Sequence, residues 1–321
     1  MEYYDNLENI QKKLSENLEN KYLKLELSPY LTQLQLDNFK SIMKNLEYDS
    51  LHITSWEQNI WKKEGFTKLS NFYSDLTHLK KFGLKIFVND LNPEGSQILA
   101  QGLSKLLSIE ELTLDLTSCP VLDQGLNYFL DVICQLDKLQ SLILLIDEIK
   151  IGKDSIDSIF SSLLKINQLK KLEISFDINT TTKFYQEISN GLQKLTGLQK
   201  LIIQVKAEKQ LQIYEIINSI SKLENLKFLL LEIQSNEKLV DLDIQMITIL
   251  NKLQNLSTFH FYGYSYKSNL HQQKLKILKY INGRQKIIDF KINHDENQQQ
   301  NSKIIQTTKK IKQLVLLDFF E

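Results

Sequence analysis

The stretch Leu136–Asp147 reads LDKLQSLILLID, and its spacing decides the fold. Its leucine and isoleucine residues fall first at intervals of three and then at intervals of two, at positions 136, 139, 142, 144 and 146. Alternation places the side chains of Leu142, Leu144 and Ile146 on one face of an extended strand, whereas intervals of three are typical of a turn or a helix end. The stretch therefore predicts the entry into a β-strand.

The same spacing of apolar residues recurs along most of the chain. Related stretches begin at Leu76, Leu106, Ile166, Leu195, Leu223 and Leu253. The first strand residues of the seven clear copies are Phe82, Leu112, Leu142, Leu172, Leu201, Leu229 and Phe259, in steps of 30, 30, 30, 29, 28 and 30. Weaker copies place further first strand residues at Leu23, Leu51, Ile288 and Leu314. A period this regular predicts a solenoid of about eleven repeats.

Apolar residues at helical spacing lie between these predicted strands. In one copy they are Leu122, Leu126, Phe129, Leu130, Ile133 and Leu136, and in the copy before it Ile98, Leu99, Leu103, Leu106 and Leu107. Intervals of three and four indicate amphipathic helices. Strands that alternate with helices predict an α/β fold, in which a parallel sheet lines the concave face of a curved horseshoe and helices cover the convex face.

We expect one repeat domain over residues 1–321. Within it, residues 1–20 would form an N-terminal capping helix and residues 21–75 irregular first repeats. Residues 76–265 would form the regular repeats, and residues 266–321 irregular C-terminal repeats and a cap. The apolar C-terminal strand around Leu314 would present an unpaired edge that could contact a partner.

The balanced charge of the chain limits its partners. Thirty-nine basic residues match thirty-nine acidic ones, so no overall field draws the chain to nucleic acid or to an anionic membrane. No apolar run approaches the roughly 20 residues of a membrane-spanning helix, and the polar first residues do not resemble a secretory signal. Two cysteines are too few for a disulfide scaffold. We therefore expect an intracellular, cytoplasmic location with no membrane contact.

The repeats resemble those of leucine-rich repeat proteins of the ribonuclease-inhibitor class, and more narrowly an extended repeat of ciliate proteins. The residues that carry the resemblance best are Phe82, Leu84, Ile86, Asn89, Leu91 and Gly95, and in the next copy Leu112, Leu114, Leu116, Cys119, Leu122 and Gly125. The family implies an asparagine or cysteine that satisfies backbone groups in the loop after each strand. Such a residue stands seven positions after the first strand residue in four of nine copies. The resemblance implies an architecture and no particular activity.

Strand residues between the leucines would line the concave surface of the sheet. An apolar and acidic centre comprises Asp115, Ile143, Leu145, Asp147, Glu173, Asp177, Ile202 and Leu230, and an aromatic cluster comprises His260, Tyr262, Tyr264 and Tyr266. Contiguous apolar residues and tyrosines are typical of protein interfaces. The alternative is a sheet face that is merely solvated. We expect these residues to bind another protein.

We expect no catalytic, cofactor-binding or metal site. The carboxylates of the centre could hold a cation or act as an acid and a base, but no Asp-x-Asp-x-Asp-Gly loop accompanies them. The five histidines are scattered, and neither His-Glu-x-x-His nor a glycine-rich phosphate loop occurs. Lysine pairs at 80–81, 170–171 and 309–310 are more typical of a solvated rim than of a nucleic-acid site. Cys119 and Cys134 are expected to be buried structural residues.

These patterns favour a non-catalytic protein–protein interaction module that acts as an adaptor, a scaffold or a subunit of a larger assembly. The alternative is a RanGAP-like regulator of a small GTPase, because such activators share this repeat type. Arg284 is the single arginine available to that alternative. A third interpretation, nucleic-acid binding through the lysine rim, predicts salt-sensitive retention on DNA or RNA.

Overall fold

The computed structural model of the chain describes residues 22–26, 32–45, 48–55, 62–86, 91–176, 184–207, 209–235, 237–265, 270–282 and 289–292. The chain divides into two compact units, unit 1 (Met1–Leu169) and unit 2 (Lys170–Glu321). The predicted capping helix at 1–20 and the predicted last repeat around Leu314 lie outside the described residues. The single uninterrupted domain therefore stays a prediction.

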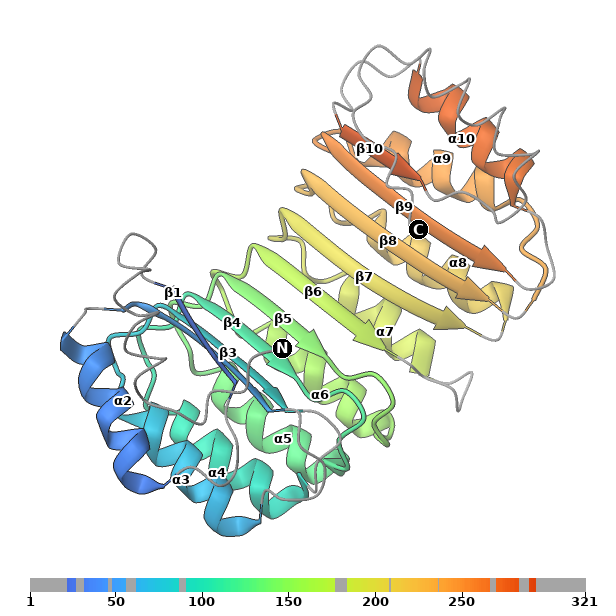
Figure 1. Ribbon diagram of the computed structural model, residues 1–321. Helices are drawn as coiled ribbons and strands as arrows, with labels where there is room; N and C mark the ends of the chain where they lie inside the picture. The colour runs from blue at the N-terminus through green and yellow to red at the C-terminus, as the bar shows by residue number, and fades with distance from the viewer. Residues whose placement is uncertain are drawn as a thin grey trace. The chain divides into compact units, whose positions relative to one another are not determined.

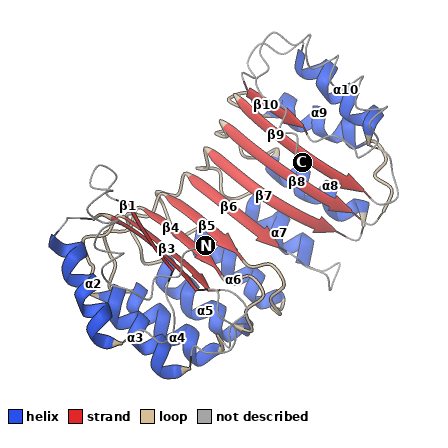
Figure 2. Cartoon of the chain, in the orientation of Figure 1, coloured by secondary structure: helices blue, strands red, loops and turns tan. Residues whose placement is uncertain are grey.

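Unit 1 alternates strands with helices along the chain (Figure 1). Its strands are β1 (Tyr22–Glu26), β2 (Ser50–Ser55), β3 (Lys81–Ile86), β4 (Glu111–Asp115) and β5 (Ser141–Leu145). Its helices are α2 (Gln33–Asn45), α3 (Lys63–Ser74), α4 (Pro93–Leu103), α5 (Leu122–Ile133) and α6 (Lys153–Leu163). The strands are parallel and pair in the order of the sequence, and the helices lie on one face of the sheet (Figure 2).

Unit 2 follows the same plan. Its strands are β6 (Lys171–Phe176), β7 (Lys200–Ala207), β8 (Phe228–Ser235), β9 (Thr258–Ser265) and β10 (Asp289–Ile292). Its helices are α7 (Phe184–Leu192), α8 (Gln210–Ile220), α9 (Leu242–Lys252) and α10 (His271–Asn282). These strands are also parallel and in sequence order, with the helices on one face (Figure 2). The predicted α/β repeat architecture is therefore confirmed.

The strand registers match the predicted period. In unit 1, strand pairing aligns Leu23, Leu51, Phe82, Leu112 and Leu142. In unit 2 it aligns Leu172, Leu201, Leu229 and Phe259. All nine side chains are buried against the helices, because alternation turns them to the face that the helices cover.

The register of the last described strand differs from the prediction. Phe290 lies opposite Phe259, whereas the period had placed Ile288 there. The step from Phe259 is thus 31 residues, as it is from Leu51 to Phe82, and not the 29 residues that Ile288 would give. A shift of two residues keeps each side chain on its predicted face, but it places Lys291, and not Asp289, opposite His260.

The helices bury the apolar stripes that their spacing predicts, with two corrections. Leu126, Phe129 and Leu130 of α5 are at most 1% exposed. Leu122 is 46% exposed, since it begins α5 with φ 55° and the residue before it, Val121, fills the core position. Leu107 is 62% exposed, because α4 has already ended at Leu103.

Adjacent repeats are joined by main-chain hydrogen bonds just before six of the strands, β3, β4, β5, β7, β8 and β9. The carbonyl oxygen of Asp49 accepts the amides of Lys80 and Lys81, at 2.8 and 3.0 Å. The same fork recurs at the carbonyl oxygens of Lys80, Glu110, Lys170, Gln199 and Lys227, each of which accepts two amides from the next repeat. This carbonyl ladder fixes where each strand starts relative to the strand before it.

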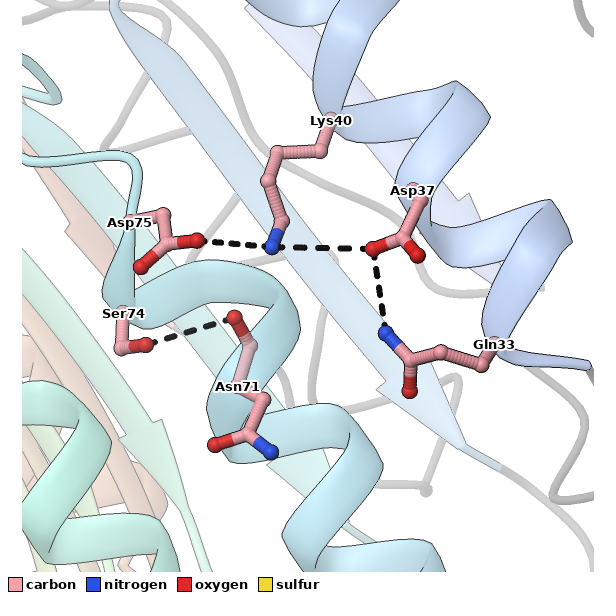
Figure 3. A network of polar contacts seen from close by, with 6 residues as sticks. All are labelled: Gln33, Asp37, Lys40, Asn71, Ser74 and Asp75. Carbon is pink, nitrogen blue, oxygen red and sulfur yellow. Dashed lines mark hydrogen bonds and ion pairs between the residues drawn. The ribbon is translucent and has the colours of Figure 1, made fainter.

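Side chains on the helices add further links between neighbouring repeats. Lys40 of α2 donates to Asp75, just after α3, at 2.8 Å, and lies 3.8 Å from Asp37 (Figure 3). Gln33 donates to the same Asp37 carboxylate at 3.0 Å. The hydrogen bond from Lys40 lowers the pKa of Asp75.

Two glycines allow the helices of unit 1 to approach each other closely. A methyl group on Gly95 of α4 would lie 2.7 Å from the Phe66 ring of α3, and one on Gly125 of α5 would lie 2.7 Å from the Ser96 hydroxyl. Real side-chain carbons do not tolerate such distances. The predicted glycine position therefore serves packing between repeats.

Candidate functional site

In each unit, the sheet face away from the helices is here called the open face, and these two open faces carry most of the predicted site residues. They are Asp115 on β4, Ile143 and Leu145 on β5, Glu173 on β6, Ile202 on β7, Leu230 on β8, and His260 and Tyr262 on β9. Asp147 lies two residues after the end of β5. Asp177 and Tyr266 lie outside the described residues, as does the side chain of Tyr264.

In unit 1, two apolar side chains mark the open face of β5. Ile143 and Leu145 are half-buried, whereas the alternating Leu142 and Leu144 are fully buried on the helix side. Strand pairing places Leu145 beside Asp115 of β4. The open face of β5 is therefore more apolar than that of β4.

Asp115 is held by groups of its own unit. Its carboxylate pairs with the Lys85 ammonium at 2.9 Å and accepts the Thr117 amide at 3.2 Å, and the residue is 2% exposed. The ammonium and the amide thus satisfy the carboxylate within the unit. Asp115 therefore lies on the predicted face but is largely inaccessible to a partner.

His52 and Gly83 form a second internal contact on the open face of unit 1. A methyl group on Gly83 would lie 2.0 Å from Nδ1 of His52, so the imidazole occupies the space above the glycine. Burial lowers the pKa of His52, and the positive charges of Lys24 and Lys85 lower it further, while Asp115 opposes them. The histidine is thus favoured in its neutral form.

In unit 2, the register aligns an acidic residue with two apolar residues. Glu173 lies beside Ile202, and Ile202 lies beside Leu230 on the next strand. All three side chains are half-buried. His260 lies beside Leu230 on the following strand, is 8% exposed, and is the last residue of the row. We call these four residues the unit 2 row.

Polar and aromatic groups flank the unit 2 row on both sides. On one side, Gln204 donates to the Glu232 carboxylate at 2.9 Å. On the other side, the Lys200 ammonium lies 4.6 Å from the centroid of the Phe228 ring, and that ring meets the His260 ring edge-on at 5.2 Å. A cation over an aromatic face and an edge-to-face ring pair are both favourable contacts.

Sequence reasoning missed Phe228 and Lys200 as members of this surface. Both stand one residue before the first core residue of their strands, Leu229 and Leu201, so alternation assigns them to the open face. The predicted rows began one residue after the core residue. Extending the alternation backwards by one step would have found both.

The two cysteines differ in burial. Cys119 is buried, and its thiol lies 2.9 Å from the Ile86 carbonyl oxygen of the preceding repeat. It thus satisfies a backbone carbonyl at the end of β3, whereas the family resemblance implies contacts to backbone groups in the loop after the strand. Cys134 is half-buried rather than buried, because it caps the C-terminus of α5, and its thiol lies 3.3 Å from the Asp131 carbonyl oxygen.

Other predicted features can be placed only in part. Among the described residues, no group of three or more histidine, cysteine, aspartate or glutamate side chains could hold a metal ion. Within that same part of the chain, no helix is long and apolar enough to cross a membrane. Lys81, of the first lysine pair, forms an ion pair with Glu111 at 3.0 Å. Arg284 and the lysine pair at 309–310 lie outside the described residues, so the GTPase-regulator alternative stays a prediction.

Comparisons with known proteins add little to this picture. No known protein family matches the chain, and no curated protein does. Among solved structures, the chain is similar to the actin-binding site 2 of leiomodin-1, with 20% sequence identity and a TM-score of 0.33. That similarity covers 40% of this chain and 72% of the other. A similarity of this degree does not assign a function.

Proposed function

We propose that the chain is a leucine-rich repeat protein of the ribonuclease-inhibitor class that binds another protein through the open faces of its sheets and performs no chemistry of its own. As such a module it would serve as an adaptor, a scaffold or a subunit of a larger intracellular assembly. The observation that carries the proposal is the pair of half-buried apolar side chains, Ile143 and Leu145, on the open face of β5.

The stability of the repeat does not require these two side chains to be apolar. The helix-side core of β5 is already filled by Leu142 and Leu144, which are 0% exposed. An apolar side chain that is left partly in water contributes fully only when another surface covers it. Adjacent apolar side chains on an otherwise polar sheet face are therefore typical of an interface.

The proposal is tested by the double substitution Ile143→Asp and Leu145→Asp. Interface residues of this kind contribute about 1–2 kcal/mol each to binding, so two charges should weaken capture of co-purifying proteins at least about tenfold. Proteins retained from a lysate by the immobilised variant and by wild type would be quantified by mass spectrometry. Because Leu145→Asp places a second carboxylate beside Asp115, the thermal midpoint should fall, and capture is therefore compared at a temperature below the midpoint of the variant.

A matched control is the double substitution Leu107→Asp and Leu164→Asp in the same unit. These leucines are 62% and 41% exposed and lie outside the open face, in the turn after α4 and at the C-terminus of α6. The control should retain the captured proteins. If the Ile143 and Leu145 variant captured the same proteins as wild type and as the control, the site assignment would be wrong.

A further inference from the structure

Glu173 forms no ion pair with any described residue. Within the described part of the chain, no lysine, arginine or histidine nitrogen lies within 4.0 Å of its carboxylate. Burial raises the pKa of Glu173, an effect that the positive charge of Lys200 only partly opposes. A half-buried carboxylate without a close cation is destabilising in the free protein, and a cation brought by a partner would relieve it.

The neighbouring lysine is engaged elsewhere. Lys200 stands next to Lys171 in the register, two residues before Ile202, and its ammonium lies over the Phe228 ring of β8. The lysine therefore extends toward β8, away from β6, which carries Glu173. Another carboxylate of this open face, Glu232, accepts hydrogen bonds from both Gln204 and Gln234. Of these two described carboxylates, Glu173 is thus the one that is left for an external partner.

We propose that the unit 2 row binds a protein segment in which a lysine or arginine lies beside apolar side chains, with Glu173 accepting the cation and Ile202 and Leu230 covering the apolar groups. This inference rests on the proposed function and adds to it the chemistry of the partner. Charge complementarity indicates a basic residue in the partner, because the charged residue of the row that lacks a close counterion, Glu173, is negative. It also disfavours nucleic acid, whose phosphates would be repelled by Glu173.

The strand spacing predicts the spacing of the partner's residues. Neighbouring strands lie about 4.8 Å apart, so Leu230 lies about 10 Å from Glu173 across the sheet. Residues on one side of an extended peptide repeat at about 6.6 Å, and residues three or four apart on a helix lie about 5–6 Å apart. Ile202 lies one strand spacing, about 4.8 Å, from Glu173, so a partner residue at about 5–6.6 Å from the basic one would lie over Ile202 or between Ile202 and Leu230. The basic residue should therefore stand two to four residues from the apolar one in the bound segment.

A display library of random twelve-residue peptides, selected on the immobilised full chain, tests the proposal. Enriched peptides should carry a lysine or arginine two to four residues from an apolar residue. A synthetic peptide of the enriched sequence should bind Glu173→Gln at least about tenfold more weakly than wild type, measured by fluorescence anisotropy. The same peptide should bind the control variant Glu224→Gln with the affinity that it has for wild type, since Glu224 is an exposed glutamate away from the open face.

A charge exchange completes the test. The same peptide with glutamate in place of its basic residue should bind Glu173→Lys better than wild type. Enriched peptides without a basic residue, no enriched peptide at all, or equal affinity of wild type and Glu173→Gln would each overturn the proposal. A dimer in sedimentation that Glu173→Gln abolishes would overturn it in favour of a second copy of the chain.

These outcomes are separate from a failure of the proposed function. Loss of co-purifying proteins in the Ile143 and Leu145 variant would uphold protein binding even if unit 2 selected no basic peptide. The thermal midpoint of Glu173→Gln should match that of wild type or exceed it, which excludes unfolding as the cause of weaker binding.

Discussion

The open faces of the two units differ in how their charges are satisfied. In unit 1, β3 and β4 form two ion pairs across the sheet, Lys81 with Glu111 and Lys85 with Asp115. In unit 2, Glu173 has no such pair among the described residues. The same repeat can thus use a charge to hold its own strands together or leave it available to a partner. Which of the two applies depends on the neighbouring strand and not on the residue type.

The largest expected effect comes from breaking the buried pair of unit 1. Lys85→Met removes the cation from Asp115, whose side chain is 3% exposed, and leaves that carboxylate without its counterion. We expect a loss of about 2–3 kcal/mol in the free energy of unfolding, at the lower end for a buried pair because the Lys85 side chain is 30% exposed. Urea unfolding followed by circular dichroism measures it.

The matched control for this prediction lies on the same two strands. Lys81→Met breaks the pair with Glu111, in which both side chains are about half exposed, 52% and 44%. An exposed pair contributes little, so this loss should stay below about 0.5 kcal/mol. Equal losses in the two variants would contradict the view that burial separates the two pairs.

Replacing Asp115 and Glu173 with their amides should change the free energy of unfolding by a smaller amount. The change should have opposite signs in the two units. Asp115→Asn should destabilise unit 1 by about 1–2 kcal/mol, because it removes a charge-assisted contact in a buried site. Glu173→Gln should raise the free energy of unfolding slightly, by no more than about 0.5 kcal/mol, because it removes a charge without a close partner. Urea midpoints at pH 7 would reveal the difference, and a clear loss of stability in Glu173→Gln would show that Glu173 is structural.

The smallest effect is a pH dependence that belongs to unit 1. The lowered pKa of His52 means that the folded chain binds a proton less readily than the unfolded chain, whose histidine titrates near about 6.5. Stability from this group is therefore complete above about pH 6.5 and is lost as the pH falls through the lowered pKa. The hydrogen bond from Lys40 also lowers the pKa of Asp75, but the stability from that carboxylate is complete above its unfolded value of about 3.9 and is lost only at more acidic pH.

The comparison that tests this dependence is between wild type and His52→Gln. Glutamine does not titrate, so the variant should lose less stability than wild type between pH 7 and pH 5 in urea unfolding. Identical slopes for the two proteins would mean that the imidazole is not responsible.

Much of the fold could be predicted because the repeat encodes it twice, in the alternation of each strand and in the distance between strands. The last described strand shows the limit of this approach. Ile288 and Phe290 are both apolar and both fit the alternation, so the sequence does not decide which one pairs with Phe259. Val121 and Leu122 raise the same difficulty, and only the positive φ of Leu122 resolves it.

The site was predicted as a face but not as a set of accessible groups. Alternation assigned Asp115 and Glu173 correctly to the open face, yet burial and ion pairing make them chemically different. Their difference depends on the paths of two lysine side chains, since Lys85 reaches Asp115 while Lys200 turns to Phe228. Long flexible side chains choose among neighbours by packing, which residue spacing does not encode.

The carbonyl ladder before the strands has a consequence for how such a chain can change over time. The fork at Asp49, Lys80 and Glu110 is made entirely of main-chain atoms, so it places no demand on the side chains at those positions. Every residue type except proline supplies the required amide. Substitutions can therefore accumulate at these positions while the spacing of the repeats is inherited unchanged, and the architecture can persist after sequence similarity to its relatives has been lost.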